Sequence, residues 1–133
     1  MALVADNSVV LAWFIGSQST SYSEKALGRA ARETIHVPQV WPLEFGNALR
    51  QLERRRKLKP EEATNMLDGV GALDLQIDAA PPSQHRLIDL ARQYDLSVYD
   101  ASYLELAIRL SVKLATQDAS LAAAAKKAGL LFS

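Results

Sequence analysis

The amino-acid sequence predicts an α/β fold in which parallel strands alternate with helices. Apolar runs of three or four residues alternate along the chain with longer stretches in which apolar residues recur at helical spacing. This alternation is typical of β-α units around a parallel sheet. The chain has 133 residues, the length of one globular domain, and shows neither an internal repeat nor a linker. We therefore expect a single domain over residues 1–133.

The first part of the chain predicts two strands and two helices. The run Leu3–Ala5 is short and apolar, as expected of a first strand. A helix follows from Val9 to Ile15, opened by a Ser or Asn cap and ended by Gly16. Small and apolar residues at helical spacing predict a second helix over 22–33, and the β-branched residues of segment 35–37 predict the second strand.

The middle of the chain predicts a pair of antiparallel helices. Pro42 suits the first turn of a helix, which closes on the four cations Arg54–Lys57, where the helix dipole favours positive charge. Pro60 opens the next helix, whose apolar residues, Leu67 among them, we expect to face inward. Together the two helices span Leu43–Leu73.

The last part of the chain predicts three strands and three helices. Pro81, Pro82 and Ser83 form a helix start, and Gly129 marks the end of an alanine-rich final helix. In chain order, the predicted elements are a strand at 75–78, helices at 83–94 and 99–110, a strand at 112–115, a helix at 118–128 and a strand at 130–132.

Composition excludes several classes of function. No apolar run approaches the ~18 residues of a membrane span, and Asp6 stands where a signal peptide would continue its apolar stretch. The chain has no cysteine, which excludes thiolate chemistry and fits a reducing cytoplasm. Fifteen Lys and Arg residues balance fifteen Asp and Glu residues, so any contact with nucleic acid must be local.

Four carboxylates are the candidate site residues: Asp6, Glu44, Asp100 and Asp118. Parallel α/β sheets bind ligands just beyond the carboxyl ends of their strands. Asp6 directly follows the first predicted strand, and Asp118 follows the strand at 112–115 by three residues. Glu44 and Asp100 lie in the first turns of their helices and can reach the same edge. We expect the four side chains to converge there.

Carboxylates within ~4–6 Å of one another repel, so such a cluster either takes up protons or recruits a cation. Oxygen ligands without cysteine favour Mg²⁺ or Mn²⁺, bound by all four acids. A cation that keeps its waters leaves room for a phosphate and a water nucleophile, as metal-assisted phosphodiester hydrolysis requires.

A simpler reading of the acids is also open, because helix first turns favour Asp and Glu as caps and for dipole reasons alone. Ser8, Asn47 and Thr116 could position substrate or water near the acids, or serve only as ordinary turn and helix residues. Four further acids lie on helix faces and are most simply solvated: Glu24, Asp68, Asp89 and Glu105.

The remaining polar and aromatic residues carry weaker signals. Trp13 and Trp41 are expected in the core. The cations Arg54–Lys57 are either a solvated helix end or a contact for RNA or an acidic partner. His36 falls in a predicted strand and His85 on a remote helix face, so a two-histidine acid–base nuclease has little support.

Four segments, in order along the chain, resemble the successive motifs of a known family. They are Asp6–Val10, Trp41–Leu49, Tyr99–Ala107 and Leu114–Asp118. On these segments the chain is similar to PIN-domain ribonucleases, and most closely to the VapC-type toxins of toxin–antitoxin pairs, over essentially its whole length. Asn7 departs from the small residue commoner in the family, but it is not a proposed ligand.

The resemblance implies a three-layer α/β/α fold with a five-stranded parallel sheet. It also implies Mg²⁺ or Mn²⁺ at the acidic pocket, endonucleolytic cleavage of RNA, a homodimer, and a cognate VapB-type antitoxin whose C-terminal segment is clasped by the helical pair Leu43–Leu73. Competing functions are a housekeeping PIN nuclease of RNA processing, a catalytically inactive PIN-like binding module and a metal-dependent phosphatase acting on a small molecule.

Overall fold

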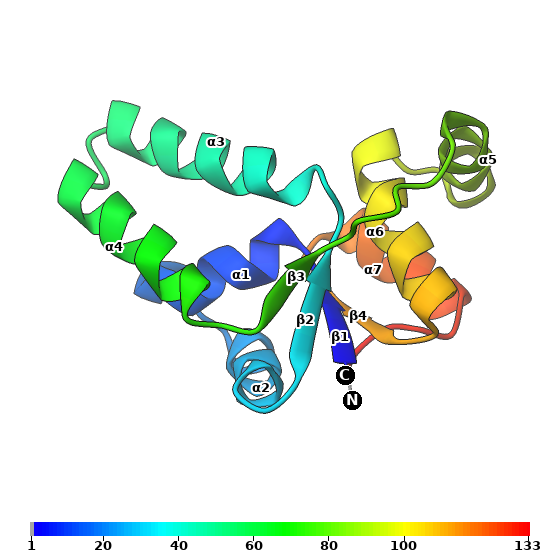
Figure 1. The fold of residues 1–133 in the computed structure, drawn as a ribbon, viewed down its shortest axis with the longest axis horizontal. Coiled ribbons are helices and arrows are strands. Elements are labelled where there is room, and N and C mark those ends of the chain that lie inside the picture. Colours follow the sequence, from blue (N-terminus) through cyan, green and yellow to red (C-terminus); the bar gives the residue numbers. More distant parts are fainter. Residues whose placement is uncertain (1) are drawn as a thin grey trace.

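The computed structural model describes residues 2–133, so Met1 of the expected domain lies outside it. Its centre is a parallel sheet with the strand order β3-β2-β1-β4 (Figure 1). In register, Leu3 of β1 lies between Ile35 of β2 and Lys113 of β4. The strands are β1 (Ala2–Ala5), β2 (Thr34–Val37), β3 (Leu75–Ile77) and β4 (Lys113–Ala115).

The expected fifth strand at 130–132 is reduced to one bridge, so the prediction of five strands is wrong. Leu131 pairs in parallel with Leu114. In this bridge the N–H of Leu114 donates to the carbonyl of Leu130, and the N–H of Phe132 donates to the carbonyl of Leu114. The next carbonyl is diverted, because Phe132 accepts a hydrogen bond from the Tyr22 hydroxyl at 2.9 Å instead of continuing the ladder. The Phe132 ring packs edge-on against the Tyr22 ring at 5.6 Å.

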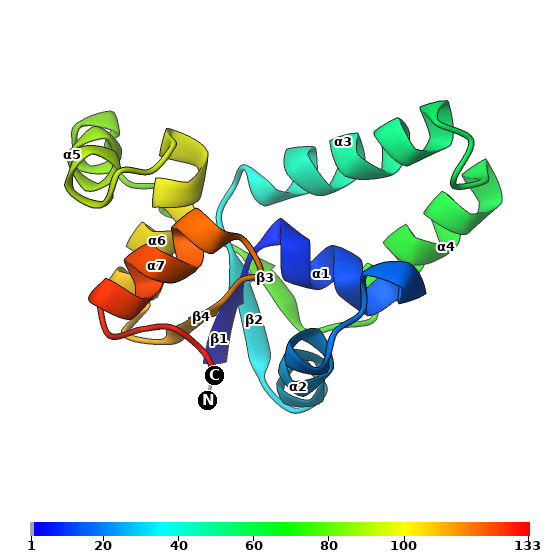
Figure 2. The same ribbon diagram turned by 180° about the vertical axis from the view of Figure 1, so that it is seen from behind.

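Helices cover both faces of the sheet, which gives the expected three layers. α1 to α4 lie on one side and α5 to α7 on the other (Figures 1 and 2). None of the helices within residues 2–133 has the length and apolar content needed to cross a bilayer. The helices are α1 (Asn7–Phe14), α2 (Ser21–Ala30), α3 (Trp41–Arg54), α4 (Pro60–Gly71), α5 (Gln84–Tyr94), α6 (Val98–Leu110) and α7 (Ala119–Lys127), with a short 3-10 helix, η1 (Gly16–Gln18).

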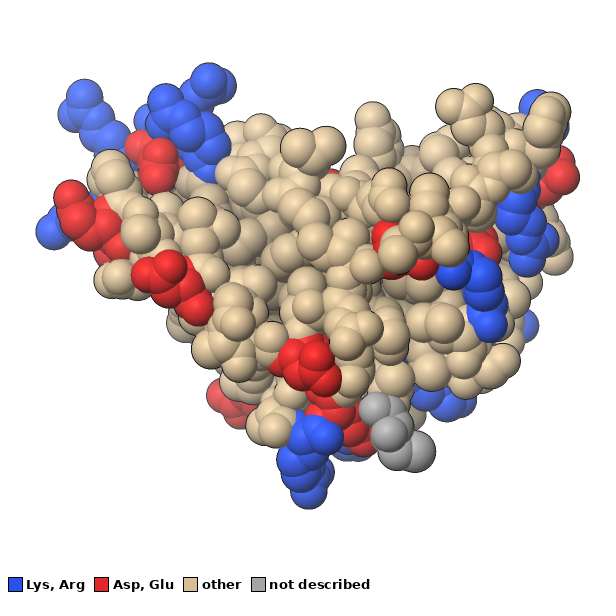
Figure 3. All heavy atoms as spheres, in the orientation of Figure 1, with Lys and Arg blue, Asp and Glu red and all other residues tan. Residues whose placement is uncertain are grey.

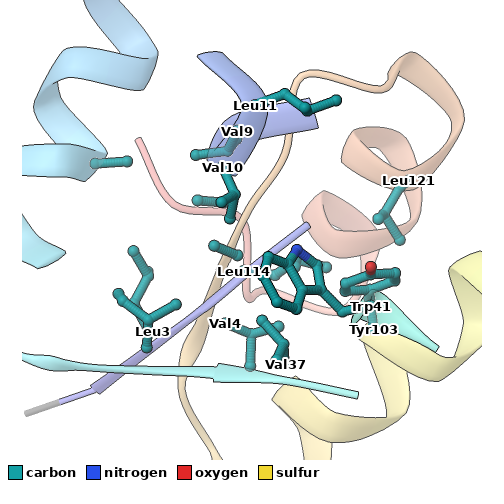
Figure 4. Packing of buried hydrophobic residues seen from close by; sticks show 14 of the residues in the cluster. Leu3, Val4, Val9, Val10, Leu11, Val37, Trp41, Tyr103, Leu114 and Leu121 are labelled. Atoms are coloured by element: carbon teal, nitrogen blue, oxygen red, sulfur yellow. The ribbon is translucent and has the colours of Figure 1, made fainter. Parts of the chain in front are cut away.

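The core lies between the sheet and its helices (Figure 4). Residues of β1 such as Leu3 and Val4 are fully buried, as expected of a central strand covered on both faces. Both tryptophans belong to this packing, as predicted. Trp41 is buried and stacks on Phe45 with ring centroids 5.0 Å apart, and Trp13 donates its Nε1–H to the Ser23 carbonyl at 2.9 Å.

The antiparallel pair α3–α4 projects beyond the sheet (Figure 1). α4 approaches α1 closely, because a Cβ built at Gly69 would lie 2.6 Å from the Phe14 ring. Leu67 of α4 does not face inward as expected, since it is 53% exposed, and Leu43 of α3 is 76% exposed. Basic side chains gather at the far end of the pair (Figure 3), where the run Arg54–Lys57 is exposed.

Candidate active site

The candidate site lies where the order of strands reverses. From β1 the chain builds outward through β2 and β3, and it then returns to place β4 on the other side of β1. Ligands of open α/β sheets bind beyond the carboxyl ends of the strands at this switch point. Asp6 follows β1 there, and its backbone N–H donates to the carbonyl of Ala115, the last residue of β4, at 3.1 Å.

Asp6 is held in place by hydroxyls from two parts of the chain. One of its oxygens accepts hydrogen bonds from the Ser8 hydroxyl at 2.6 Å and the Val9 N–H at 3.2 Å. The other accepts the Thr116 hydroxyl at 2.5 Å. Burial raises the pKa of the Asp6 carboxyl, while these hydrogen bonds oppose the rise and the charge of Asp118 adds to it. Asp6 is therefore a buried, oriented carboxylate.

Asp6 also caps α1 through its bond to Val9 N–H, so the Ser or Asn cap that we expected is wrong. Asn7 and Ser8 are equally good capping residues by type. They lie inside the helix because β1 ends at Ala5 and the chain turns at Asp6.

Hydrogen bonds join the turn after β4 to the turn after β1. The Ser8 hydroxyl accepts the N–H of Gln117 at 2.9 Å, and the Thr116 hydroxyl accepts the N–H of Asp118 at 3.0 Å. Asp118 in turn caps α7 by accepting the N–H of Leu121 at 2.9 Å. Ser8 and Thr116 thus fix the position of Asp118 as well as the carboxylate of Asp6.

Glu44 comes from the first turn of α3 and is held by a residue that sequence reasoning missed. The hydroxyl of Tyr103 on α6 donates to its carboxylate at 2.6 Å. Tyr103 is only 1% exposed, and burial together with this contact to Glu44 raises the pKa of its hydroxyl. The tyrosine therefore remains protonated and acts as a fixed donor. A tyrosine three residues after Asp100 lies on the same helical face, and that spacing is the signal that could have found it.

Asp100 is half-buried in the first turn of α6 and is not the cap, which is Ser97. The pKa of its carboxyl is raised from 3.8 to about 6, first by burial and then by the charges of Asp118, Asp6 and Glu44. Each of the other three candidate acids thus contributes to the field at Asp100. Four acids from four separate segments share one electrostatic environment.

Asn47 and Asn7 both lie near Glu44. Asn47 is exposed one turn further along α3 and lines a hollow of 360 Å³ together with Glu44, Leu43 and Tyr99. Asn7 Nδ2 lies 3.5 Å from the backbone carbonyl of Glu44, at the limit of a hydrogen bond. The hollow gives the Glu44 carboxylate an opening to solvent.

Comparison with known proteins identifies the family to which this arrangement belongs. Residues 3–127 match the family model described as the PIN domain. The chain belongs to the PIN-domain family. It is 30% identical over 124 residues to Ribonuclease VapC3 of Pyrobaculum aerophilum, across 92% of this chain and 93% of the relative. It is also 38% identical over 96 residues to Ribonuclease VapC1 of Mycobacterium tuberculosis, across 70% of each chain.

A solved structure agrees with this assignment at the level of the fold. The crystal structure of PAE2754 from Pyrobaculum aerophilum matches with a TM-score of 0.72 at 24% identity, over 93% of this chain and 79% of that chain. The resemblance to VapC-type PIN ribonucleases inferred from the sequence motifs is thus confirmed by relatives that cover most of the chain.

The donor set of this PIN domain suits a hard divalent cation. The four candidate side chains offer oxygen atoms only, and the buried Oδ1 of Asn7 has no hydrogen-bond partner within residues 2–133. In the same residues, no three acidic or histidine side chains converge closely enough to enclose one ion. Mg²⁺ usually keeps several waters and uses one or two carboxylates, so the arrangement fits a hydrated ion rather than a fully enclosed one.

One acid outside the site differs from its prediction. Glu105 was expected to be solvated on a helix face, but it is 5% exposed. Its carboxylate accepts hydrogen bonds from Arg109, one turn further along α6, and Arg109 also pairs with Asp78 after β3. The three residues tie α6 to the sheet. The arginine is the first cause that lowers the pKa of the Asp78 carboxyl.

Proposed function

We propose that this PIN-domain protein is a divalent-metal-dependent endoribonuclease that acts as the toxin of a toxin–antitoxin pair. The observation that carries the proposal is the gathering of Asp6, Glu44, Asp100 and Asp118 in one electrostatic field at the switch point of the sheet. Similarity to Ribonuclease VapC3 over 92% of the chain supports RNA as the substrate.

In this proposal the four acids hold a hydrated Mg²⁺ or Mn²⁺, one or two of them by direct contact and the others through its waters. Bound there, the cation would supply charge stabilisation to a phosphodiester and lower the pKa of a water molecule. Ser8 and Thr116 keep the carboxylate of Asp6 oriented, and Tyr103 does the same for Glu44. Asn47 lies at the opening beside Glu44, where it can donate to a phosphate oxygen or orient a water.

The chemistry should be hydrolysis rather than attack by the RNA 2′-hydroxyl. Attack by the 2′-hydroxyl needs a positioned base and acid, usually histidines. His36 lies within β2 and His85 on the exposed surface of α5, and neither lines the hollow beside Glu44. We therefore expect products with 5′-phosphate and 3′-hydroxyl ends, and continued cleavage when the nucleotide 5′ to the scissile phosphate is 2′-deoxy. Products with 2′,3′-cyclic phosphate ends would contradict this mechanism.

The decisive experiment measures RNA cleavage by the purified protein with chelator, Mg²⁺ or Mn²⁺. Activity should disappear in chelator and return with either ion, and Asp6→Asn or Asp100→Asn should abolish it while the fold is retained. Asp89→Asn, an exposed acid of α5, is the matched control and should cleave at the wild-type rate. Full activity in excess chelator, or in both site variants, would refute the proposal.

The toxin role requires an antitoxin, for which the helical pair α3–α4 is the proposed binding surface. The exposed leucines Leu43 and Leu67 on this pair are suited to anchor an apolar face of a partner helix. Co-expression with the product of the adjacent gene should give a complex and relieve toxicity. Failure of both would remove the toxin role and leave the nuclease. The proposed homodimer is tested separately by the mass of the purified protein in solution.

A further inference from the structure

A pocket of 220 Å³ lies beside the candidate acids, at the start of α6. It forms where the turn between β2 and α3, the proline-rich segment before α5 and the first turn of α6 meet. We call it the Tyr99 pocket; its lining includes Pro38, Val40, Pro82, Leu87, Val98 and Tyr99.

The Tyr99 pocket and the candidate site share a wall. Tyr99 precedes Asp100 in the chain, so their Cα atoms are about 3.8 Å apart. Tyr99 and Val40 line both this pocket and the hollow that contains Glu44 and Asn47. A molecule bound in the hollow beside Glu44 therefore lies next to the Tyr99 pocket.

The exposure of Tyr99 is not explained by packing. Its side chain is 62% exposed, and the neighbouring Val98 is 40% exposed. Burying an aromatic side chain is normally favourable, so an exposed aromatic residue at the rim of a pocket indicates a surface that a ligand covers. The face between α3 and α6 is largely free of charged side chains (Figure 3).

The chemistry of the pocket favours a flat, uncharged ring. Asp78 is the one charged residue in its lining, and its carboxylate is held by a two-pronged contact with Arg109, which also pairs with Glu105. Within residues 2–133, no cation lines the pocket to hold a phosphate, and most of the lining is apolar. Its volume lies below the roughly 300–1,000 Å³ of sites for drug-sized ligands, which suits a single ring system.

We propose that the Tyr99 pocket binds one unpaired nucleobase of the RNA substrate, next to the scissile phosphate, with the Tyr99 ring as its stacking surface. The proposal rests on the proposed RNA cleavage. Unpaired bases are commonly recognised by stacking on aromatic side chains, whereas bases inside a helix are not accessible in this way. The pocket would thus select single-stranded RNA, and the bound base would place the adjacent scissile phosphate beside Asp100.

The test combines the removal of one base with the removal of the Tyr99 ring. A short single-stranded RNA that the wild type cuts at one bond is prepared in versions that each lack one base near that bond. In the wild type, one of these abasic substrates should lose about ten-fold to a hundred-fold in kcat/KM, the range expected for one base stacked on one ring. Tyr99→Ala should lose a similar factor in kcat/KM on the intact RNA. Its kcat/KM on the abasic substrate should be no lower than on the intact RNA.

Two variants serve as controls in the same assay. Tyr99→Phe keeps the ring and should retain activity on the intact RNA together with the sensitivity to the missing base. Ile88→Ala removes an exposed apolar side chain from α5 that does not line the pocket, and it should behave as the wild type. RNA dissociation constants measured in chelator allow the same comparison of intact and abasic RNA, in the wild type and in the variants, without any cleavage.

The outcomes separate this inference from the proposed function. If the missing base has the same effect in the wild type and in Tyr99→Ala at every position, in cleavage and in binding, the inference is wrong while the nuclease stands. If Tyr99→Ala instead changes the oligomeric state or the binding of an antitoxin and leaves RNA affinity unchanged, the pocket is a protein interface and the inference is also wrong. If the protein does not cleave RNA, but loss of the base weakens RNA binding in the wild type and not in Tyr99→Ala, the nuclease proposal is wrong and the inference stands.

Discussion

Replacement of Asp100 by asparagine should stabilise the folded protein at neutral pH while it abolishes cleavage. The asparagine keeps the size and shape of the side chain but removes its charge. In the wild type that charge is half-buried and is repelled by the charges of Asp118, Asp6 and Glu44, so ionisation of Asp100 is costly in the folded state and inexpensive in the unfolded chain. The variant is free of this cost.

The size of the effect follows from the pKa of the carboxyl. A pKa raised from 3.8 to about 6 corresponds to about 3 kcal/mol at a pH above both values. Because Asp100 keeps part of its contact with water, we discount this to about 1–2 kcal/mol, or about 3–8 °C in Tm for a chain of this length. The folded state binds the extra proton between the two pKa values, so wild-type stability falls as pH rises from about 4 to about 7.

The assay is thermal or denaturant unfolding in chelator at pH 4 and at pH 7.5. Asp100→Asn and the wild type should be equally stable at pH 4, and the variant should be more stable at pH 7.5. Asp89→Asn should match the wild type at both pH values. Addition of Mg²⁺ should stabilise the wild type more than Asp100→Asn, because binding to the folded state alone adds to its stability. An unchanged or lower stability of Asp100→Asn at pH 7.5 would show that the four acids do not share a field.

Three further predictions concern single contacts. Tyr103→Phe removes the donor to Glu44, and cleavage should fall about ten-fold and need more Mg²⁺ when activity is titrated with the ion. Arg109→Met leaves Glu105 buried without its partner and should cost about 2–4 kcal/mol in urea unfolding, while the double variant with Glu105→Met recovers most of the loss. Gly129→Ala places a Cβ at a φ of +74° and should lower the unfolding free energy by about 1 kcal/mol, with no change in cleavage.

The parts of the site that could be predicted from sequence are those set by local order along the chain. Asp6 follows a short apolar run and Asp118 follows another, and parallel strands bring such positions to one edge. Glu44 and Asp100 could be placed because each lies in the first turn of a helix. The hydrogen-bond partner of each carboxylate could not be predicted from the sequence. The contact of Tyr103 with Glu44 joins residues 59 positions apart.

The errors have a common physical origin in tertiary context. An apolar triplet at 130–132 satisfies every local criterion for a strand, yet Tyr22 captures the carbonyl that would extend the ladder. Glu105 looked solvated because glutamate usually is, but α6 lies across the sheet and Arg109 supplies the compensating charge. Leu67 has the spacing of a core residue on a helix that stands partly clear of the sheet, which leaves it exposed.

The bond between Asp6 and Thr116 joins residues 110 positions apart. During synthesis the carboxylate of Asp6 is made early, but the hydroxyl that orients it is made only when β4 has been added at the other edge of β1. Contacts of such long separation in the chain form late in folding, since a large loop must close first. A growing chain would therefore carry an incomplete centre until β4 has been made, which would delay the onset of the proposed cleavage to that point.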